Sequence, residues 1–243
     1  MIKNFKQDFY KFRDKIANRE PFALSRCNDG EAIIMFDESI DIRNKCNGEF
    51  FYIPTEPLHK KYRQQLIDSA QYKGDNYYVG IACRDCIPED RHFKLKTLTT
   101  QDEEHLTWGN IFVNANYPLF QNEILPLFNN FDVILIANYK ANPNQLPFKD
   151  KIIKKFDVHT NCWMEDQNLL IEVPDYIREN NINGAIILFA AGPFSNILIM
   201  ECYKQNQNNF LLDIGSTLDP YMNLGYTRGY LVGSETLNKI CIW

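Results

Sequence analysis

Three short and almost entirely apolar runs of residues constrain the fold of this chain most strongly. Residues 132–138 read Asp-Val-Ile-Leu-Ile-Ala-Asn, residues 184–192 read Gly-Ala-Ile-Ile-Leu-Phe-Ala-Ala-Gly, and residues 209–215 read Asn-Phe-Leu-Leu-Asp-Ile-Gly. A strand with one face in water alternates apolar and polar residues, whereas a continuous apolar run is typical of a strand covered on both faces. The sequence therefore predicts a mainly parallel sheet flanked by helices.

Helical patterns and further strands alternate with these runs along most of the chain. Strands are also expected at residues 22–27, 77–82, 111–113 and 156–160, and helices at residues 56–71, 118–129, 149–155 and 166–180 and from residue 193 onward. Residues 83–108 are charged and irregular. This alternation predicts an α/β fold, with one Rossmann-like domain spanning residues 1–243.

Composition excludes several classes of protein. The net charge of −5 over 243 residues argues against a nucleic-acid partner, because such proteins normally carry a basic surface. The sequence has no apolar run long enough to span a bilayer, and its first residues lack the apolar core of a signal peptide. The seven cysteines are odd in number and lack the spacing of a disulfide framework. We therefore expect a cytoplasmic protein with reduced thiols and no transmembrane segment.

Residues 1–19 form a predicted amphipathic helix. Its apolar residues recur at helical spacing with basic residues between them: Ile2, Phe5, Phe9, Phe12 and Ile16, and Lys3, Lys6, Lys11, Arg13 and Lys15. A basic amphipathic helix can make peripheral contact with an anionic membrane. The commoner explanation is a first helix packed on the domain, and we favour it.

The strongest candidate for chemistry follows the first expected strand. Asp29 and Glu31 flank Gly30 in an Asn-Asp-Gly-Glu turn into a helix, and Arg26 lies just upstream. Asparagine and glycine tolerate positive φ, so we expect a tight turn here. Carboxylate oxygens are the ligands that Mg²⁺ and Mn²⁺ prefer, and substrate phosphates usually complete such sites. Gly30 lets a diphosphate approach the backbone, and Arg26 can pair with phosphate.

Two other strand ends carry unusual residues. Gly192, Pro193 and Ser195 form a small-residue turn into a helix whose free N–H groups can hold phosphate. Asp213 and Asp219 follow the last apolar run. Ligands of open α/β sheets bind at the carboxyl ends of the strands, so we expect these three ends to converge on a metal–diphosphate site.

The three segments together resemble the GT-D type glycosyltransferases, bacterial and viral enzymes with a Rossmann-like single domain and an Asp-x-Glu metal motif. The likeness covers residues 22–221 and is strongest at its two ends. Family members usually read Arg-Phe-Gly-Asp-Gly-Glu where this chain has Asn28 in place of the first glycine. Their Asp-Ile-Gly is commonly followed by histidine, whereas Ser216 stands at that position here.

The resemblance implies transfer of a hexose from a nucleoside-diphosphate sugar, with a UDP-sugar favoured, to a hydroxyl on a glycan or glycoprotein. It implies Mn²⁺ or Mg²⁺ as cofactor and, for a viral source, a location in the host cytoplasm. The metal would be held by Asp29 and Glu31. The nucleotide site would comprise Arg26, Asn28, Gly30, Gly192, Pro193 and Ser195. If the reaction inverts the anomeric carbon, a carboxylate must accept the acceptor's proton, and Asp213 and Asp219 are the candidates.

Two alternative functions remain open. A methyltransferase, a dehydrogenase or another Rossmann-type nucleotide enzyme would share the fold class, although the sequence has neither a Gly-x-Gly-x-x-Gly turn nor a Walker loop. A non-catalytic glycan- or nucleotide-binding module would share both the fold class and the pocket. Turnover of a UDP-sugar distinguishes the enzyme from the module.

Two weaker signals have structural explanations as well. Cys83-x-x-Cys86 is a single pair without well-spaced histidines, so we interpret it as two small residues in a loop rather than a zinc or redox site. His159, at an expected strand end, can contact a sugar hydroxyl or a phosphate, and Trp163 or Trp108 can stack on a base or pyranose. All three can equally be structural.

Overall fold

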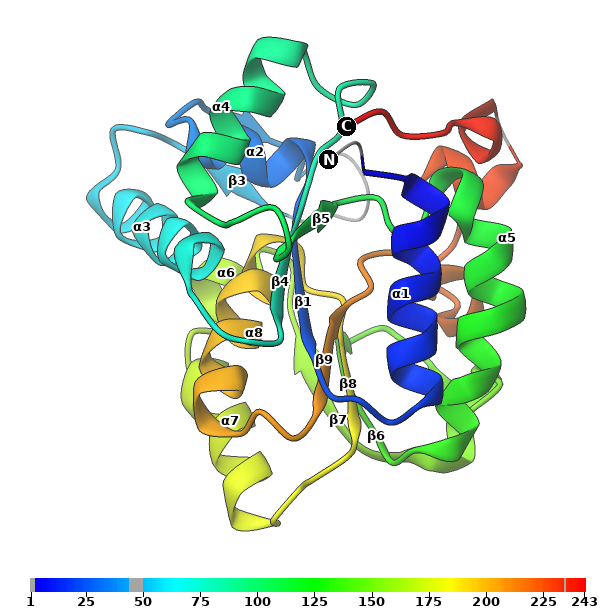
Figure 1. The fold of residues 1–243 in the computed structure, drawn as a ribbon. Coiled ribbons are helices and arrows are strands. Elements are labelled where there is room, and N and C mark those ends of the chain that lie inside the picture. Colours follow the sequence, from blue (N-terminus) through cyan, green and yellow to red (C-terminus); the bar gives the residue numbers. More distant parts are fainter. Residues whose placement is uncertain (1–2, 44–49, 234) are drawn as a thin grey trace.

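The sheet is the centre of the molecule. The computed structural model describes residues 3–43, 50–233 and 235–243, and in these residues seven parallel strands form one sheet in the order β5-β4-β1-β9-β8-β6-β7 (Figure 1). The strands are β1 Ala23–Cys27, β4 Tyr77–Ile81, β5 Leu106–Trp108, β6 Val133–Asn138, β7 Ile152–Val158, β8 Ile186–Phe189 and β9 Phe210–Asp213. A small antiparallel pair, β2 Ile40–Asp41 and β3 Phe51–Tyr52, lies apart from it. The predicted mainly parallel sheet is confirmed.

The strand order reverses beside β1. After β1 the chain adds β4 and β5 on one side of it, and the later strands β9 and β8 follow one another on the other side. Ligand sites of open α/β sheets form at such a reversal. The carboxyl ends of β1, β9 and β8 are therefore neighbours, as the sequence predicts.

Alternate residues of the central strands contribute to two separate cores. In β6, Ile134 and Ile136 belong to one core, whereas Val133, Leu135 and Ala137 belong to the other. Side chains of a strand point alternately to opposite faces of its sheet. The apolar runs are thus continuous because helices and loops cover both faces.

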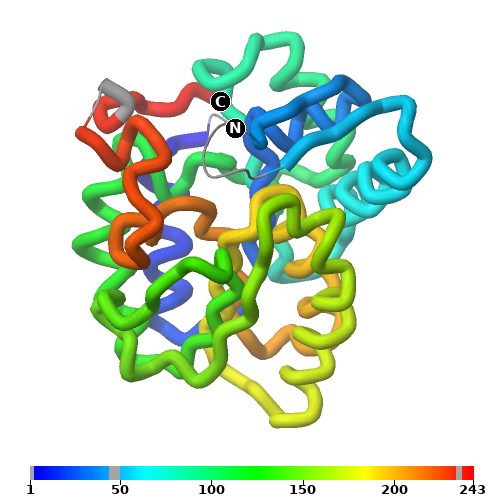
Figure 2. The backbone as a smooth tube through the Cα atoms, turned by 180° about the vertical axis from the view of Figure 1, so that it is seen from behind, coloured from blue at the N-terminus to red at the C-terminus, as the bar shows by residue number. Residues whose placement is uncertain are grey.

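Helices cover the two faces of the sheet (Figures 1 and 2). One face carries α1 Phe5–Ala17 and α5 Tyr117–Leu119, and the other carries α3 Pro57–Gln71, α6 Cys162–Glu165, α7 Leu169–Glu179 and α8 Pro193–Gln205. The remaining helices, α2 Asp29–Met35 and α4 Glu89–Thr99, lie beyond the carboxyl ends of the strands, near both chain termini.

The apolar face of α1 is buried in the domain. Phe9, Phe12 and Ile16 are fully buried, and Nζ of Lys3 donates to the carbonyl oxygens of Glu103 and Leu106 at 2.6 Å. Of the helix predicted over residues 1–19, residues 5–17 are helical, and residues 1 and 2 lie outside the described residues. The apolar face of this helix therefore packs on the domain, as the favoured interpretation expects.

The region predicted to be irregular contains a helix. The face of α4 that packs inward consists of His92, Leu95 and Thr99, which have helical spacing but are mostly polar. Hydrophobic periodicity is the main signal of an amphipathic helix. The helix was missed because polar side chains occupy its buried positions.

Two other predicted elements are wrong, and a third is helical but irregular. The helix expected at residues 149–155 is a single turn followed by β7, an edge strand that overlaps the strand expected at residues 156–160. Lys154 of β7 is exposed, and charged residues are a common feature of sheet edges. The strand expected at residues 111–113 is a buried turn after β5. The helix expected at residues 118–129 begins as α5 but continues as a wider turn and then a tighter one.

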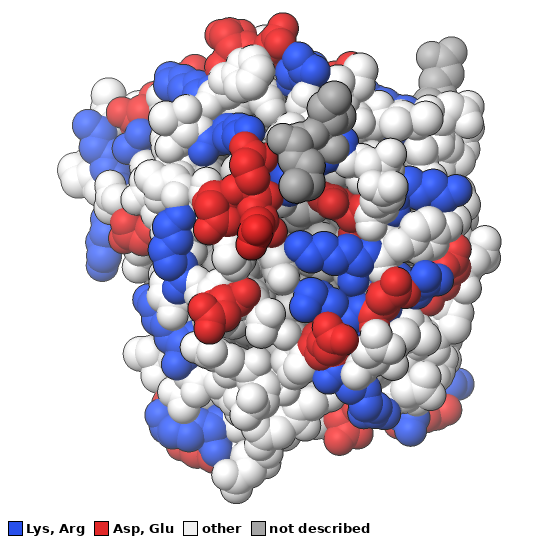
Figure 3. Space-filling view, viewed as in Figure 1, with Lys and Arg blue, Asp and Glu red and all other residues white. Residues whose placement is uncertain are grey.

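Acidic and basic side chains are interspersed on the face of the molecule shown in Figure 3. Among the described residues, no helix is both long and apolar enough to pass through a bilayer.

Candidate functional site

Two adjoining pockets lie along the carboxyl ends of β1, β9 and β8. The larger pocket has a volume of about 460 Å³, and the smaller pocket has a volume of about 250 Å³. Both are lined by Phe50, Gly192, Gly215, Ser216 and Arg228. A ligand can therefore extend from one pocket into the other.

Most of the residues predicted for the site line these pockets. The larger pocket contains Arg26, Asn28, Asp29, Gly30, Glu31, Gly192 and Asp213. The smaller pocket contains Gly192, Pro193 and Asp219. The structure thus brings together three chain segments that are far apart in the sequence.

The connection from β1 to α2 is a single residue, Asn28, and it lacks the positive φ angles expected of the predicted turn. Asn28 has φ −85° and precedes α2 directly, and neither it nor Gly30 adopts a positive φ. The backbone N–H of Asn28 donates to Oε2 of Glu31 at 3.0 Å. Glycine at position 30 is explained by space, since a Cβ there would lie 3.0 Å from the Phe50 ring.

The carboxyl group of Glu31 is buried among other acids. Burial, and then the negative charges of Asp213 and Asp29, raise its pKa to about 8. A carboxylate is costly to bury unless a cation or hydrogen-bond donors compensate it. Asp29 is exposed at the mouth of the pocket.

Asp213 forms a buried ion pair with Arg26. Nη2 of Arg26 lies 3.1 Å from Oδ1 of Asp213, and the same oxygen accepts the N–H of Gly215 at 2.9 Å. Burial raises the pKa of Asp213, and the neighbouring Arg26 charge opposes this rise. Arg26 also donates from Nη1 to the carbonyl oxygen of Gly109 at 3.2 Å, so the guanidinium is held in place at the floor of the pocket.

Gly192 and Gly215 are required by the backbone and by close contacts. Gly192 has φ +54° and ψ −138°, a combination that residues with a side chain rarely adopt. Gly215 has φ +50°, and a Cβ there would lie 2.5 Å from Nη2 of Arg26. The two glycines therefore shape the wall shared by the two pockets.

Ser195 does not reach either pocket, contrary to the prediction. It is fully buried, and its hydroxyl oxygen accepts the N–H of Ala191 at 3.0 Å. The N–H groups of Phe194 and Ser195 donate to the carbonyl oxygens of Ala191 and Gly192. These groups stabilise the turn before α8, so they are not available as the expected phosphate cradle.

Basic residues and one acid line the smaller pocket. Lys140, His159 and Arg228 line it together with Asp219. The Thr227 hydroxyl donates to Oδ2 of Asp219 at 2.7 Å.

His159 is oriented by a neighbouring acid. Its Nδ1 lies 2.7 Å from Oδ1 of Asp166, and the hydrogen bond between them raises the pKa of His159. Its ring stacks on Tyr139, with the ring centres 5.3 Å apart. The imidazole therefore lies at the pocket with its charged form favoured.

The tryptophans are mainly structural. Trp108 is buried in the core and lines neither pocket. Trp163 lines the smaller pocket, but it is fully buried and packs near Tyr52, His59 and Tyr62. It forms part of a wall rather than an exposed stacking platform.

The carboxylate oxygens of the larger pocket are of the kind that a divalent cation such as Mg²⁺ or Mn²⁺ prefers. Asp29 and Glu31 supply hard ligands, and a cation beside them would offset the burial and the repulsion that raise the pKa of Glu31. Among the described residues, the group of three potential metal ligands that lie within 4.8 Å of one another consists of cysteines. Asp29, Glu31 and Asp213 therefore do not form a three-carboxylate cluster of that size. Mg²⁺ sites of this kind use one or two carboxylates and complete the shell with water and substrate phosphates.

Sequence reasoning missed several pocket residues. Phe50, Asn110, Asn114, Arg228 and Tyr230 line the larger pocket but lie outside the segments at the ends of β1, β8 and β9. Arg228 and Tyr230 belong to the C-terminal segment, which has no apolar period. The signal in the sequence that could have indicated a binding site there is a basic and an aromatic residue on either side of Gly229.

Comparison with known proteins identifies the fold. No family model and no curated protein match the sequence. Two solved structures of domain of unknown function 1792 are similar over 93% of this chain and 81% of their own, with 14% identity and TM-scores of 0.60 and 0.59. One is described with the words "the highly conserved domain of unknown function 1792 has a distinct glycosyltransferase fold". The chain therefore has a glycosyltransferase fold, with a mainly parallel seven-stranded sheet flanked by helices.

Proposed function

We propose that this protein is a glycosyltransferase that moves a hexose from a nucleoside-diphosphate sugar, with a UDP-sugar favoured, to an acceptor hydroxyl on a glycan or glycoprotein, with Mn²⁺ or Mg²⁺ as cofactor. One observation carries the proposal. In a glycosyltransferase fold, Asp29 and Glu31 share a pocket with the buried Arg26 at the reversal of strand order.

In this proposal Asp29 and Glu31 hold the cation, which stabilises the negative charge that develops on the leaving diphosphate. Arg26 faces the same charge. Its Nε has no hydrogen-bond partner among the described residues, and the Asp213 carboxylate fixes the position of its guanidinium. A preorganised cation in a buried site stabilises developing negative charge more strongly than a mobile one.

The two carboxylates predicted as candidate bases have different surroundings. Asp213 is paired with Arg26, so we assign it to positioning that side chain. Asp219 lines the smaller pocket, as His159 does, and its Oδ2 accepts a hydrogen bond from the Thr227 hydroxyl. If the reaction inverts, Asp219 is therefore the better candidate to accept the acceptor's proton.

The junction of the pockets suggests how the donor is bound. We place the diphosphate at the shared wall of Gly192, Gly215 and Arg228, with the acids on one side and the basic groups of the smaller pocket on the other. Arginine binds phosphate with two parallel hydrogen bonds.

The test is a thermal-shift panel of UDP-, GDP- and CMP-sugars, with and without Mn²⁺, followed by measurement of nucleotide release. Ligands that bind only the native state raise its unfolding temperature. We expect a UDP-sugar to give the largest shift, to need Mn²⁺ and to be turned over. Asp29→Asn and Glu31→Gln should abolish the Mn²⁺-dependent release.

Glu38→Gln is the matched control, because Glu38 lies just after α2 and pairs with Arg91 at the surface. It should leave nucleotide release unchanged. Full activity in EDTA would contradict the metal-dependent mechanism. Binding of nucleotide sugars without turnover would instead favour a binding module.

A further inference from the structure

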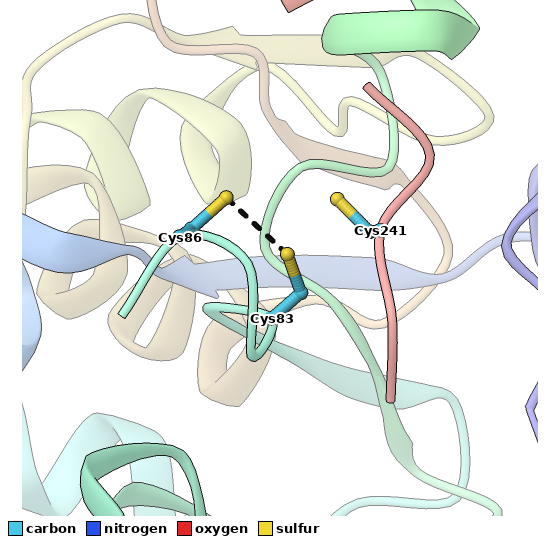
Figure 4. A group of neighbouring side chains, drawn as sticks. All are labelled: Cys83, Cys86 and Cys241. Carbon is cyan, nitrogen blue, oxygen red and sulfur yellow. Dashed lines mark hydrogen bonds between the residues drawn. The ribbon is translucent and has the colours of Figure 1, made fainter. Parts of the chain in front are cut away.

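Three cysteines meet at a point that the proposed reaction does not use. The Sγ atoms of Cys83, Cys86 and Cys241 all lie within 4.8 Å of one another (Figure 4), and those of Cys83 and Cys86 are 3.2 Å apart. Cys83 and Cys241 are buried, whereas Cys86 is partly exposed. The sequence shows Cys83-x-x-Cys86 only as a single pair in a loop, and its third neighbour, Cys241, lies 155 residues further along the chain, so residue spacing does not predict the cluster.

Two different segments of backbone create this cluster. In the loop after β4, the N–H groups of Cys86 and Ile87 both donate to the carbonyl oxygen of Cys83, at 2.9 and 3.1 Å. The C-terminal segment runs beside this loop, since the N–H of Arg84 donates to the carbonyl oxygen of Ile242 at 3.1 Å. Lys239 also donates from Nζ to the carbonyl oxygen of Asp85.

We propose that Cys83, Cys86 and Cys241 bind a zinc ion, which fastens the C-terminal segment to the loop after β4. Thiolates are soft ligands that select Zn²⁺ over Mg²⁺ or Mn²⁺. In a tetrahedral site with Zn–S bonds of about 2.3 Å, two ligating sulfurs lie about 3.8 Å apart. The sulfurs of Cys83 and Cys86 are 3.2 Å apart and all three lie within 4.8 Å of one another, so shifts of about 1 Å or less form the site. Three thiols lose three protons on binding, and water can reach the fourth tetrahedral position through the partly exposed Cys86.

Amide groups around the cluster suit thiolates rather than neutral thiols. Nδ2 of Asn110 donates to Sγ of Cys86 at 2.9 Å and to Sγ of Cys241 at 3.9 Å. Nδ2 of Asn114 donates to Sγ of Cys241 at 3.8 Å. Donors to metal-bound sulfur are a regular part of metal sites.

The site is connected to the larger pocket. Asn110 and Asn114, which contact the sulfurs, both line that pocket. Arg228 and Tyr230, from the C-terminal region, line it as well. A zinc ion at the cysteines would therefore stabilise one wall of the pocket without taking part in its chemistry.

The experiment measures metal in the full-length protein, purified without a chelator or a histidine tag from cells grown with added zinc. Elemental analysis should find about one zinc per chain. Cys83→Ser and Cys241→Ser should each reduce the zinc content to background. Cys202→Ala, a matched change of a buried thiol in α8, should leave the zinc content unchanged.

A titration of the metal-free wild-type protein with Co²⁺ needs no variant and gives a second readout. Thiolate ligation should produce an intense charge-transfer absorption that saturates at one Co²⁺ per chain and disappears when Zn²⁺ is added. The absence of this band, or equal zinc content in wild type and Cys241→Ser, would overturn the proposal. A Cys83–Cys86 disulfide in freshly purified protein would also overturn it. None of these readouts depends on glycosyl transfer, so this proposal and the proposed function can fail separately.

Discussion

The guanidinium of Arg26 and the carboxylate of Asp213 form an ion pair 3.1 Å long, with exposed side-chain fractions of only 4% and 8%. The pair links the carboxyl ends of β1 and β9, which are neighbours in the sheet but far apart in the sequence. Each charge depends on the other, because a buried charge without a partner is strongly destabilising.

This dependence predicts the effect of removing Asp213. Asp213→Ala leaves the Arg26 charge buried and the N–H of Gly215 without its acceptor, so we expect a loss of about 3 kcal/mol in the free energy of unfolding. Urea denaturation measures it. Asp14→Ala, which breaks an exposed pair with Arg13, should cost less than about 1 kcal/mol. Unchanged stability of Asp213→Ala with complete loss of turnover would restore Asp213 as a candidate base.

The ionised Glu31 carboxylate should lower the free energy of unfolding of the metal-free protein. Its pKa is about 8 in the folded protein against an ordinary value of 4.5, so between these values the folded state binds the extra proton. Stability must therefore fall as the pH rises from 4.5 towards 8. Glu31→Gln keeps an acceptor for Asn28 but removes this loss, and we expect it to be more stable by on the order of 2 kcal/mol at pH 8 and hardly at all below pH 5.

Thermal unfolding of both proteins across this pH range, without metal, tests the prediction. The Glu38→Gln control should follow the wild-type curve. A constant difference between wild type and Glu31→Gln would show that the Glu31 carboxyl group does not titrate as inferred.

His159 should make the binding of an anionic donor depend on pH. Its pKa is raised by the hydrogen bond to Asp166, so the charged imidazolium persists above its ordinary range and is lost as the pH rises through the raised value. The affinity for UDP-glucose, whose diphosphate does not titrate near neutrality, should therefore fall with rising pH. Calorimetric titrations of wild type and His159→Gln measure this, and the variant should show a flatter profile.

His105→Gln is the matched control for His159→Gln. His105 also pairs with an aspartate, Asp102, but lies outside both pockets. Its pH profile should equal that of the wild type. If His159→Gln also keeps the wild-type profile, His159 does not contact the donor.

Gly215 should be intolerant of a side chain for a reason specific to this site. A Cβ at this position would meet Nη2 of Arg26 at 2.5 Å, so Gly215→Ala must displace the guanidinium. We expect a loss of about 1–3 kcal/mol in stability and at least a tenfold loss in affinity for the donor, which corresponds to about 1.4 kcal/mol.

Gly184→Ala separates backbone strain from this contact. Gly184 also has positive φ, at +69°, but a Cβ there would meet nothing within 4 Å. It should lose stability through strain alone and keep its affinity for the donor. Equal affinities of the two variants would mean that Arg26 does not bind the donor.

Local patterns in the sequence determined much of the fold. The apolar runs that became β6, β8 and β9 predicted buried parallel strands, because a strand covered on both faces has no reason to alternate. The same patterns failed for α4, whose buried face includes His92 and Thr99, and for the first part of β7, where Lys154 is exposed at the edge of the sheet. Polar residues occupy buried positions of α4, and a lysine occupies a position of β7, so hydrophobic periodicity indicates neither element.

The site divides in the same way. The sequence alone placed Asp29, Glu31 and Arg26 at the end of a strand and predicted that three strand ends meet, since parallel strands share one carboxyl edge. Only the tertiary structure showed that Arg26 pairs with Asp213 and that Ser195 is buried in the core. It also showed that Phe50 and Arg228 line the pockets. Finally, it placed Cys241 next to Cys83 and Cys86. Periodicity and turn chemistry depend on neighbours along the chain, whereas these contacts depend on strand order and on the packing of segments that are distant in sequence.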